Sequence, residues 1–235
     1  MSDDRTILIT GAAGALGGAV VAAFLDEGAR LVLIGHDQAA LERAFPALAR
    51  DPRHALAAAD LGDALATRDR IGPVVTRAGR IDALVHVAGG FAMGVPVHAL
   101  SEDMFTAMMR QNAWSFVSIC RVVVPGMIAA GGGSVVAVSA RAAFRGAAMM
   151  GAYCASKSAL QRLVESLSAE VRDQHVNVNS VAPGTLDTPA NRRAMPDADA
   201  SRWVAPRRLA ETIAFLASPR AADIHGQHLQ VDALS

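Results

Sequence analysis

The stretch TILITGAAGALGGAVVAAF, residues 6–24, decides how the rest of the chain is interpreted. Residues 7–9 form a short apolar run typical of a buried parallel strand. From Ala15 onward apolar residues recur at helical spacing, so a glycine turn joins a strand to the start of a helix. Gly17 lets the helix pack closely on the strand, and Gly11 lets backbone approach a ligand. Free N–H groups at the positive end of a helix dipole predict a dinucleotide phosphate site, formed by Gly11, Gly14, Ala15, Leu16 and Gly17.

The overall composition indicates a folded protein with a large core. The chain has 235 residues, 52% of them hydrophobic and 19% charged, which suits one α/β domain covering residues 1–235. Basic and acidic residues both number 22, so the formal net charge is zero. Because no excess of positive charge attracts a polyanion, we expect a small-molecule substrate and no nucleic acid as partner.

The two cysteines and the apolar segments indicate in which cellular compartment the protein works. Cys120 and Cys154 lie in apolar helical patterns, so we expect buried thiols in a reducing, cytoplasmic compartment. The start MSDDRT lacks the apolar core of a signal peptide. Residues 116–144 are the most apolar region, and Arg121, Pro125 and three glycines interrupt it, so we expect no membrane span. We assign no metal site.

Strands and helices alternate along the remaining chain. Besides residues 7–9, the sequence predicts strands at 30–34, 54–59, 84–88, 134–139, 176–182 and 228–231. It predicts further helices at 37–48, 62–78, 103–128 and 153–171. The alternation predicts a doubly wound parallel sheet of seven strands with helices on both faces. Residues 183–206 are rich in Pro, Asp and Arg, and we expect a substrate lid at about 185–206.

The ends of the second and third strands fall where such folds meet the adenosine of a dinucleotide. An acid at the end of the second strand favours the 2′-OH of NAD and repels the 2′-phosphate of NADP. Gly35 stands there, and His36 offers a donor although Asp37, a plausible helix cap, follows it. We therefore expect NADP or NAD with a slight lean to NADP, and a solvated loop is the alternative. Asp60 either accepts a hydrogen bond from the adenine amino group or caps the helix that begins at Gly62.

Tyr153, the only tyrosine, and Lys157 stand four residues apart on one face of a helix. We expect the nearby ammonium to lower the pKa of the phenol from about 10 toward working pH. Such a tyrosine can hand a proton to a substrate as hydride arrives. A solvated helix face is the alternative for this pair.

Six motifs, in order, resemble the short-chain dehydrogenase/reductase family over essentially the whole chain. They are TGAAGALG at 10–17, DL at 60–61, VAGG at 87–90, Asn112, YCASK at 153–157 and PGTLDT at 183–188. The resemblance implies a Rossmann fold, a nicotinamide cofactor, hydride transfer, and homodimers or homotetramers built on the helices that bear Asn112 and Tyr153. It implies that Asn112 holds a water in a proton relay, whereas a polar residue at a packed kink is the alternative. Beyond the phosphate loop, the implied cofactor site comprises Gly35, His36, Asp60, Leu61, Ala88, Gly89, Gly90, Lys157, Pro183, Gly184, Leu186 and Thr188.

The chain departs from the pattern of that family in three ways, at four positions. Ala15 replaces a frequent glycine, and His86 and Val87 replace an asparagine pair. The third departure is Ala140, which stands where the family carries a catalytic serine, 13 residues before the tyrosine. Ser139 is adjacent, but neighbouring strand residues point to opposite faces. Loss of such a donor typically lowers turnover by ~10²–10³, so an ordinary ketone should be reduced poorly and a conjugated, electron-poor imine less so.

Quinonoid dihydropteridine reductases, within the same family, also lack this serine. The chain resembles them in VAGGF at 87–91, SARAAF at 139–144 and TLDTPANRRAMPDAD at 185–199. The resemblance implies that Phe91 lies against a pterin, beside Ala140 and Tyr153, although a core or lid contact is the alternative for Phe91. Those reductases favour NADH through an acid where this chain has Gly35, so the resemblance leaves cofactor choice open.

The sequence thus predicts an NAD(P)H-dependent oxidoreductase, with a quinonoid dihydropterin as a candidate substrate. A carbonyl or 3-oxoacyl reductase, or the reverse alcohol dehydrogenase, is the first alternative. A non-catalytic dinucleotide-binding sensor is the second, and the missing serine is the feature that favours it.

Overall fold

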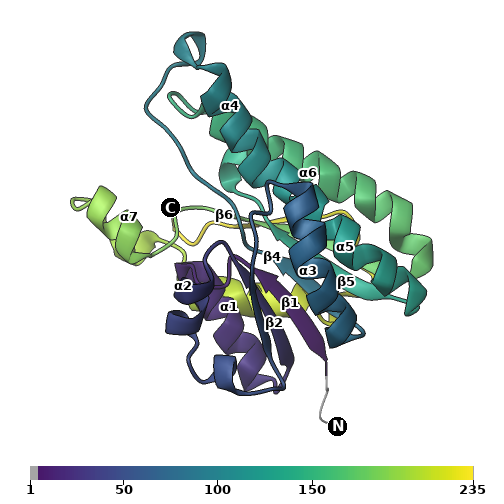
Figure 1. Ribbon diagram of the computed structural model, residues 1–235. Coiled ribbons are helices and arrows are strands. Elements are labelled where there is room, and N and C mark those ends of the chain that lie inside the picture. The colour runs from purple at the N-terminus through teal and green to yellow at the C-terminus, as the bar shows by residue number, and fades with distance from the viewer. Residues whose placement is uncertain (1–4, 235) are drawn as a thin grey trace.

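The computed structural model describes residues 5–234. Seven strands form one parallel sheet in the order β3-β2-β1-β4-β5-β6-β7 (Figure 1). The strand order reverses between β1 and β4, so the crevice outside their carboxyl ends is the place where such sheets bind ligands. The predicted seven-stranded, all-parallel α/β sheet is confirmed. The strands are β1 Thr6–Thr10, β2 Arg30–Gly35, β3 Ala55–Ala58, β4 Ala83–His86, β5 Gly133–Val138, β6 Val176–Pro183 and β7 His228–Val231.

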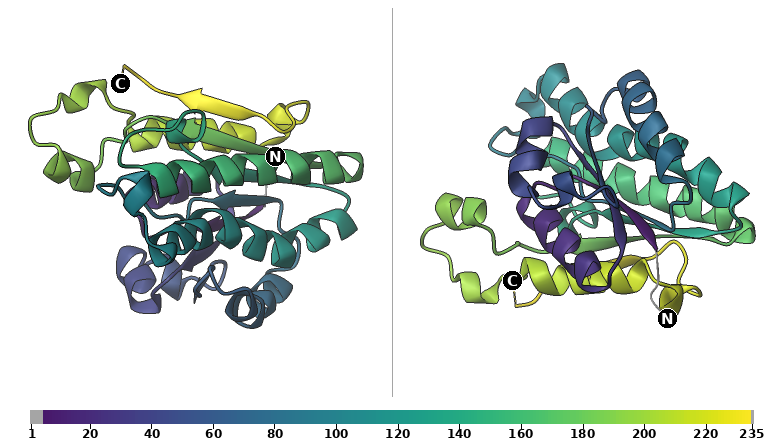
Figure 2. Two further views of the ribbon diagram at one scale, coloured as in Figure 1. Left: turned by 90° about the horizontal axis from the view of Figure 1, so that it is seen from above. Right: turned by 60° about the horizontal axis from the view of Figure 1, so that its bottom comes forward.

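Helices cover both faces of the sheet (Figure 2). The hydrophobic cluster on one face joins the sheet to α1, α2 and α8, and the cluster on the other joins it to α3, α5 and α6. A shorter segment with α7 projects from the body of the molecule in both figures. The helices are α1 Ala15–Asp26, α2 Gln38–Ala44, α3 Ala64–Ala78, α4 Glu102–Met109, α5 Ser115–Ala129, α6 Gly151–Val171, α7 Pro189–Ala194 and α8 Pro206–Leu216.

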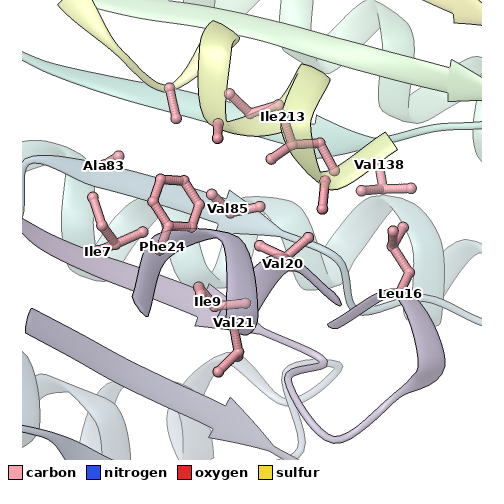
Figure 3. Close-up of a cluster of buried hydrophobic side chains, with 14 of the residues drawn as sticks. Ile7, Ile9, Leu16, Val20, Val21, Phe24, Ala83, Val85, Val138 and Ile213 are labelled. Carbon is pink, nitrogen blue, oxygen red and sulfur yellow. The ribbon is translucent and has the colours of Figure 1, made fainter. Parts of the chain in front are cut away.

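The sequence of β1 is an unbroken apolar run because the strand is buried on both faces of the sheet. Ile7 and Ile9 pack into the cluster that contains α1, whereas Leu8 packs into the opposite cluster, and all three are fully buried. Figure 3 shows Val20 and Phe24 of α1 among the strand side chains, facing Ile213 of α8. Full burial of such side chains stabilises the fold by about 1.5–3 kcal/mol each.

Several boundaries differ from the sequence-based expectation. Helix α2 ends at Ala44 rather than at residue 48, because the residue before Pro46 is disfavoured in a helical conformation. Strand β4 ends at His86 rather than at residue 88. Helix α8 was not predicted at all, although the helix is amphipathic and its apolar face packs on α1.

The predicted helix at 103–128 is a continuous apolar helix interrupted by one irregular turn. A π-helical turn, Arg110–Trp114, separates α4 from α5. By length and composition alone, Glu102–Ala129 could cross a membrane. In the structure, however, Phe116, Ile119 and Val123 are buried in the cluster shared with α3 and α6, so this is a core helix.

The glycine loop after β1 is packed without spare room. A Cβ added to Gly17 would lie 2.1 Å from the Gly11 carbonyl oxygen, whereas a Cβ on neighbouring Gly18 would meet nothing within 4 Å. Gly17 is therefore required for the close approach of α1 to the loop, and Gly18 is not.

We predict that Gly17→Ala lowers the free energy of unfolding by about 1–3 kcal/mol or more, because overpacking displaces the loop. Gly18→Ala, the matched control in the same turn, should leave stability unchanged or raise it by up to about 1 kcal/mol, through better helix propensity. Urea denaturation of the two variants measures both effects. Equal stabilities for the two variants would contradict the packing described here.

Candidate active site

The residues that the sequence singled out meet at one edge of the sheet. The carboxyl ends of the parallel strands all lie there, and each candidate segment directly follows a strand. The segments are Gly11–Gly17 after β1, Gly35 and His36 at the end of β2, Asp60 and Leu61 after β3, Ala88–Phe91 after β4, Ala140 after β5 and Pro183–Thr188 at the end of β6. Tyr153 and Lys157 reach the same edge from the first turns of α6.

The start of α1 fits a dinucleotide pyrophosphate. Helix α1 has Gly14 as its N-cap, with no side-chain cap and no acidic residue in the first turn. Gly14 and Ala15 are exposed, so the positive end of the helix is open to an anion. Gly11 has a packing role that the sequence did not reveal. Its φ is +66°, and a Cβ there would lie 2.8 Å from the backbone N of Ala88, so Gly11 permits loop–loop packing. Its approach to a ligand stays a prediction.

The end of β2 carries a glycine rather than an acid for a structural reason. A Cβ on Gly35 would lie 2.9–3.1 Å from three carbons of Leu41, a fully buried side chain of α2. Asp37 caps α2 as predicted, since its carboxylate accepts a hydrogen bond from the Ala40 N–H at 2.6 Å. His36 is exposed.

Asp60 does not cap the next helix. Asp63 does so, by accepting hydrogen bonds from Leu65 and Ala66. The Asp60 carboxylate instead accepts from the Gly62 N–H at 2.8 Å and from the Arg110 guanidinium at 3.1 Å. The capping alternative for Asp60 is therefore wrong, and Arg110 is a partner that the sequence did not reveal. Leu61 beside it is buried in the core.

The pKa of Tyr153 does not shift in the expected direction. Burial raises the pKa of Tyr153 to about 12, and neighbouring Cys154 raises it further. Burial lowers the pKa of Lys157 to about 8, and its ammonium donates to the Val138 carbonyl at 3.0 Å. The expected lowering of the Tyr153 pKa by Lys157 is wrong for this structure, because desolvation of the phenol outweighs any attraction from the ammonium.

Asn112 lies in the π-helical turn and holds the backbone of Gly90. Its side-chain oxygen accepts from the Gly90 N–H at 2.9 Å, and its amide donates to the Gly90 carbonyl at 3.0 Å. The amide also donates to the Ser156 hydroxyl at 3.0 Å, a contact that the sequence did not reveal. Asn112 is therefore a buried polar residue at an irregular turn of the helix, as the alternative interpretation expected. Its role in a proton relay stays a prediction.

Gly89 lies at the centre of this group. A Cβ on Gly89 would stand 2.7 Å from the Asn112 side-chain oxygen and 3.1 Å from the Lys157 ammonium. The two polar side chains therefore converge on a space that only a glycine leaves open. A cradle that a single Cβ would fill, beside a buried ammonium, fits the ribose of a nicotinamide nucleotide.

The serine beside Ala140 does not face the site. Ser139 is buried, and its hydroxyl donates to the Lys157 carbonyl at 3.4 Å, into the backbone of α6. Ala140 has extended backbone and is also buried, so no hydroxyl stands at this position. The expectation from strand alternation is confirmed.

Phe91 and the segment after β6 border the group. The Phe91 ring meets the Tyr153 ring edge-on with centroids 4.9 Å apart, while 59% of Phe91 is exposed. Gly184 follows the last residue of β6, Pro183, and Leu186 forms a β-bridge with Val204. The Thr188 hydroxyl caps α7 by accepting from the Asn191 N–H at 3.2 Å.

A cavity of about 450 Å³ lies at the opposite edge of the sheet. Arg5, Arg80 and Asp82, which precede β1 and β4, line it. The two guanidiniums donate to the carbonyls of Ala217 and Ala130 at the ends of α8 and α5. Since cations stabilise helix C-termini, these arginines have a structural role, and the cavity is remote from the candidate site.

Comparison with known proteins agrees with this arrangement. The profile described as short chain dehydrogenase matches residues 5–199. D-threitol dehydrogenase of Mycolicibacterium smegmatis is 31% identical over 98% of this chain and 92% of its own. Bovine (Bos taurus) L-xylulose reductase is 30% identical over 97% and 95%. A structure from Beutenbergia cavernae, assigned as an NAD(P)-dependent gluconate 5-dehydrogenase with NADP bound at low occupancy, superposes with a TM-score of 0.88 at 27% identity over 97% and 95%.

We predict a specific pH dependence of stability for the nucleotide-free protein. Between pH 8 and pH 10.5 Lys157 has lost its proton in the folded protein but keeps it when unfolded, because burial lowers its folded pKa to about 8. The unfolded state then binds more protons, so this group makes stability rise with pH, by up to about 3 kcal/mol across the window.

Lys157→Met provides the comparison. The free energy of unfolding of the variant should exceed that of the wild type most at pH 7. The difference should shrink as the pH rises to 10.5. Urea denaturation at several pH values measures the difference. Parallel pH profiles for the two proteins would contradict burial of a titrating ammonium.

Proposed function

Because the chain belongs to the short-chain dehydrogenase/reductase family, we propose that it reduces a conjugated, electron-poor substrate of the quinonoid dihydropterin type with a reduced nicotinamide nucleotide. The chain is an NAD(P)-dependent oxidoreductase rather than a non-catalytic sensor. The pterin-like substrate is the part of this statement that we infer.

The chain offers each part that a nicotinamide nucleotide requires. The open start of α1 would hold the pyrophosphate, and Lys157 beside Gly89 would hold the nicotinamide ribose. Leu186 and Thr188 would border the nicotinamide end. When bound, the reduced nucleotide supplies a hydride.

The missing hydroxyl at Ala140 is the observation that carries the choice of substrate. Reduction of an isolated ketone places negative charge on one oxygen, which needs a preorganised donor. Ala140 has none, and the Ser139 hydroxyl is engaged by the Lys157 carbonyl. A conjugated imine spreads the incoming charge over several atoms, so it depends less on such a donor.

Protonation of Tyr153 favours the reductive direction. With its pKa raised to about 12 by burial, the phenol keeps its proton at neutral pH and is available as a proton donor. Phe91, ring edge against Tyr153 and more than half exposed, offers an apolar surface for a flat heteroaromatic ring. In this proposal Asn112 keeps a relay water near the tyrosine.

The resemblance of residues 185–199 to dihydropteridine reductases gives little support for a pterin substrate. Asp187 pairs with Arg192 at 2.6 Å, Asn191 donates to the Leu186 carbonyl at 2.8 Å, and Thr188 caps α7. These residues hold the segment together, so their likeness supports a shared lid structure. Such a lid, over residues 185–206, is part of the proposal.

A carbonyl reductase or polyol dehydrogenase is the second candidate. The names of the relatives favour it, because D-threitol dehydrogenase and L-xylulose reductase act on alcohol or carbonyl groups. Under this alternative the enzyme reduces ketones without a hydrogen-bond donor at residue 140, or another group donates the hydrogen bond to the substrate oxygen.

A homodimer or homotetramer is also proposed. Phe105, Trp114 and Ile128, along α4 and α5, are 38–44% exposed. The resemblance to the family, in which assemblies are built on the helices that bear Asn112 and Tyr153, is what supports this proposal.

We predict that the enzyme oxidises NADPH or NADH when given a quinonoid dihydropterin, measured as loss of nucleotide absorbance above the non-enzymatic rate. We also predict that Ala140→Ser raises kcat/KM for a simple ketone about 10²-fold, because it restores the donor, and changes pterin reduction by less than about tenfold.

Ser139→Ala is the matched control and should alter neither reaction by more than a few-fold, since its hydroxyl faces α6. Failure to oxidise either nucleotide with the pterin removes the pterin proposal. Efficient ketone reduction by the wild type, with no gain in Ala140→Ser, supports the second candidate instead.

For cofactor choice, we propose that NADPH is accepted because no carboxylate stands at Gly35. Gly35→Asp alone should lower stability by collision with Leu41, whereas Gly35→Asp with Leu41→Ala should fold. The double variant should shift the NADPH-to-NADH ratio of kcat/KM at least tenfold toward NADH, by repulsion of the 2′-phosphate. Leu41→Ala alone is the control, and an unchanged ratio in the double variant would contradict the proposal.

A further inference from the structure

His86, where the family has an asparagine, lies in a continuous buried chain of hydrogen bonds. The Thr10 hydroxyl is 2.9 Å from His86 Nδ1 and accepts from the Ala88 N–H at 3.2 Å. On the other side, the Ser115 hydroxyl is 3.3 Å from His86 Nε2 and donates to the Gln111 carbonyl at 2.6 Å. The histidine therefore joins the loop after β4 to the π-helical turn.

The direction of every hydrogen in this chain is determined. A carbonyl can only accept, so the single Ser115 hydroxyl proton goes to Gln111 and the serine oxygen must accept from His86 Nε2–H. Burial, together with nearby Lys157, lowers the pKa of His86 to about 3, so the ring is neutral and carries one N–H. Nδ1 then accepts the Thr10 hydroxyl proton.

The serine end of the chain holds the π register. The Ser115 backbone N–H bonds to the Arg110 carbonyl, five residues back, rather than to Gln111, four back. This shift leaves the Gln111 carbonyl without its usual helical donor, and the Ser115 hydroxyl takes that place. The same turn carries Asn112, which holds both backbone groups of Gly90.

We propose that His86 is a positioning residue with two arms, one setting the Ala88 backbone through Thr10 and the other holding the Asn112 turn through Ser115. The inference rests on the oxidoreductase activity of the family and not on a pterin substrate. Phe116 fixes the ring plane, since it meets the imidazole edge-on with centroids 5.7 Å apart. The neutral ring also avoids placing a second buried positive charge near Lys157.

Two amide variants separate the arms. In His86→Asn the side-chain oxygen can still accept from Thr10, but nothing reaches Ser115. In His86→Gln the amide can still donate to Ser115, but no acceptor remains for Thr10. We expect His86→Asn to lower kcat about three- to tenfold with nucleotide affinity retained, and His86→Gln to weaken NADPH binding by a similar factor with kcat retained.

Binding of NADPH and NADH is measured by fluorescence titration, independently of any substrate. The kcat values are measured with a quinonoid dihydropterin and with 9,10-phenanthrenequinone, an electron-poor dicarbonyl. Loss of pterin turnover alone would therefore count against the proposed function and not against His86. Ser118→Ala is the control, because it removes another buried hydroxyl of α5 that has no hydrogen-bond partner within residues 5–234. It should leave kcat and affinity unchanged.

Long-range ¹H–¹⁵N spectra of the wild type test the tautomer directly, with the His86 signals assigned by their loss in a variant. A neutral Nε2–H ring at pH 5–8 supports the proposal, and an Nδ1–H or charged ring overturns it. If His86→Asn does not fold, Ser115→Ala tests the same arm and should also lower kcat with affinity retained. Variants that lose thermal stability alone, or lose kcat and affinity together without a split, overturn the two-armed role.

Discussion

The close approach of the β1 loop to the end of β4 is the constraint on which the site depends. Gly11 has a positive φ, and only a hydrogen fits in place of its side chain against the Ala88 backbone. Gly17 then lets α1 begin directly over that loop, with its uncapped end open to an anion. The same contact fixes where Ala88 and the following glycines lie, and so where the polar groups of α6 and the π-helical turn can converge.

The chemistry follows from what surrounds those glycines. Lys157 and Asn112 come from different helices and meet at Gly89, whose missing side chain leaves the space between them. Burial of these groups also keeps the Tyr153 phenol protonated and lowers the pKa of Lys157 to about 8. The proposed substrate rests on this combination, a protonated phenol with no hydroxyl at Ala140.

The sequence predicted the seven parallel strands, because apolar runs and glycine turns are local signals. The candidate site residues that it named lie at the carboxyl edge of the sheet, and their roles stay predictions. The sequence-based prediction failed where the outcome depends on residues distant in the chain. The pairing of Asp60 with Arg110 and the pKa of Tyr153 depend on the packing of separate elements. His86 could be recognised as unusual in a buried strand, but its partner Ser115 lies on a helix whose π-turn leaves no sequence period.

The central claim is that a nicotinamide nucleotide binds at the carboxyl edge, between the start of α1 and Gly89. The most direct measurement is calorimetric titration of NADPH and of NADH into the wild type and into Gly89→Ala, whose Cβ would meet Asn112 and Lys157. The account predicts one site per chain for at least one nucleotide, with affinity at least tenfold weaker in Gly89→Ala. Absence of binding to both nucleotides, or equal affinities in the two proteins, would contradict it.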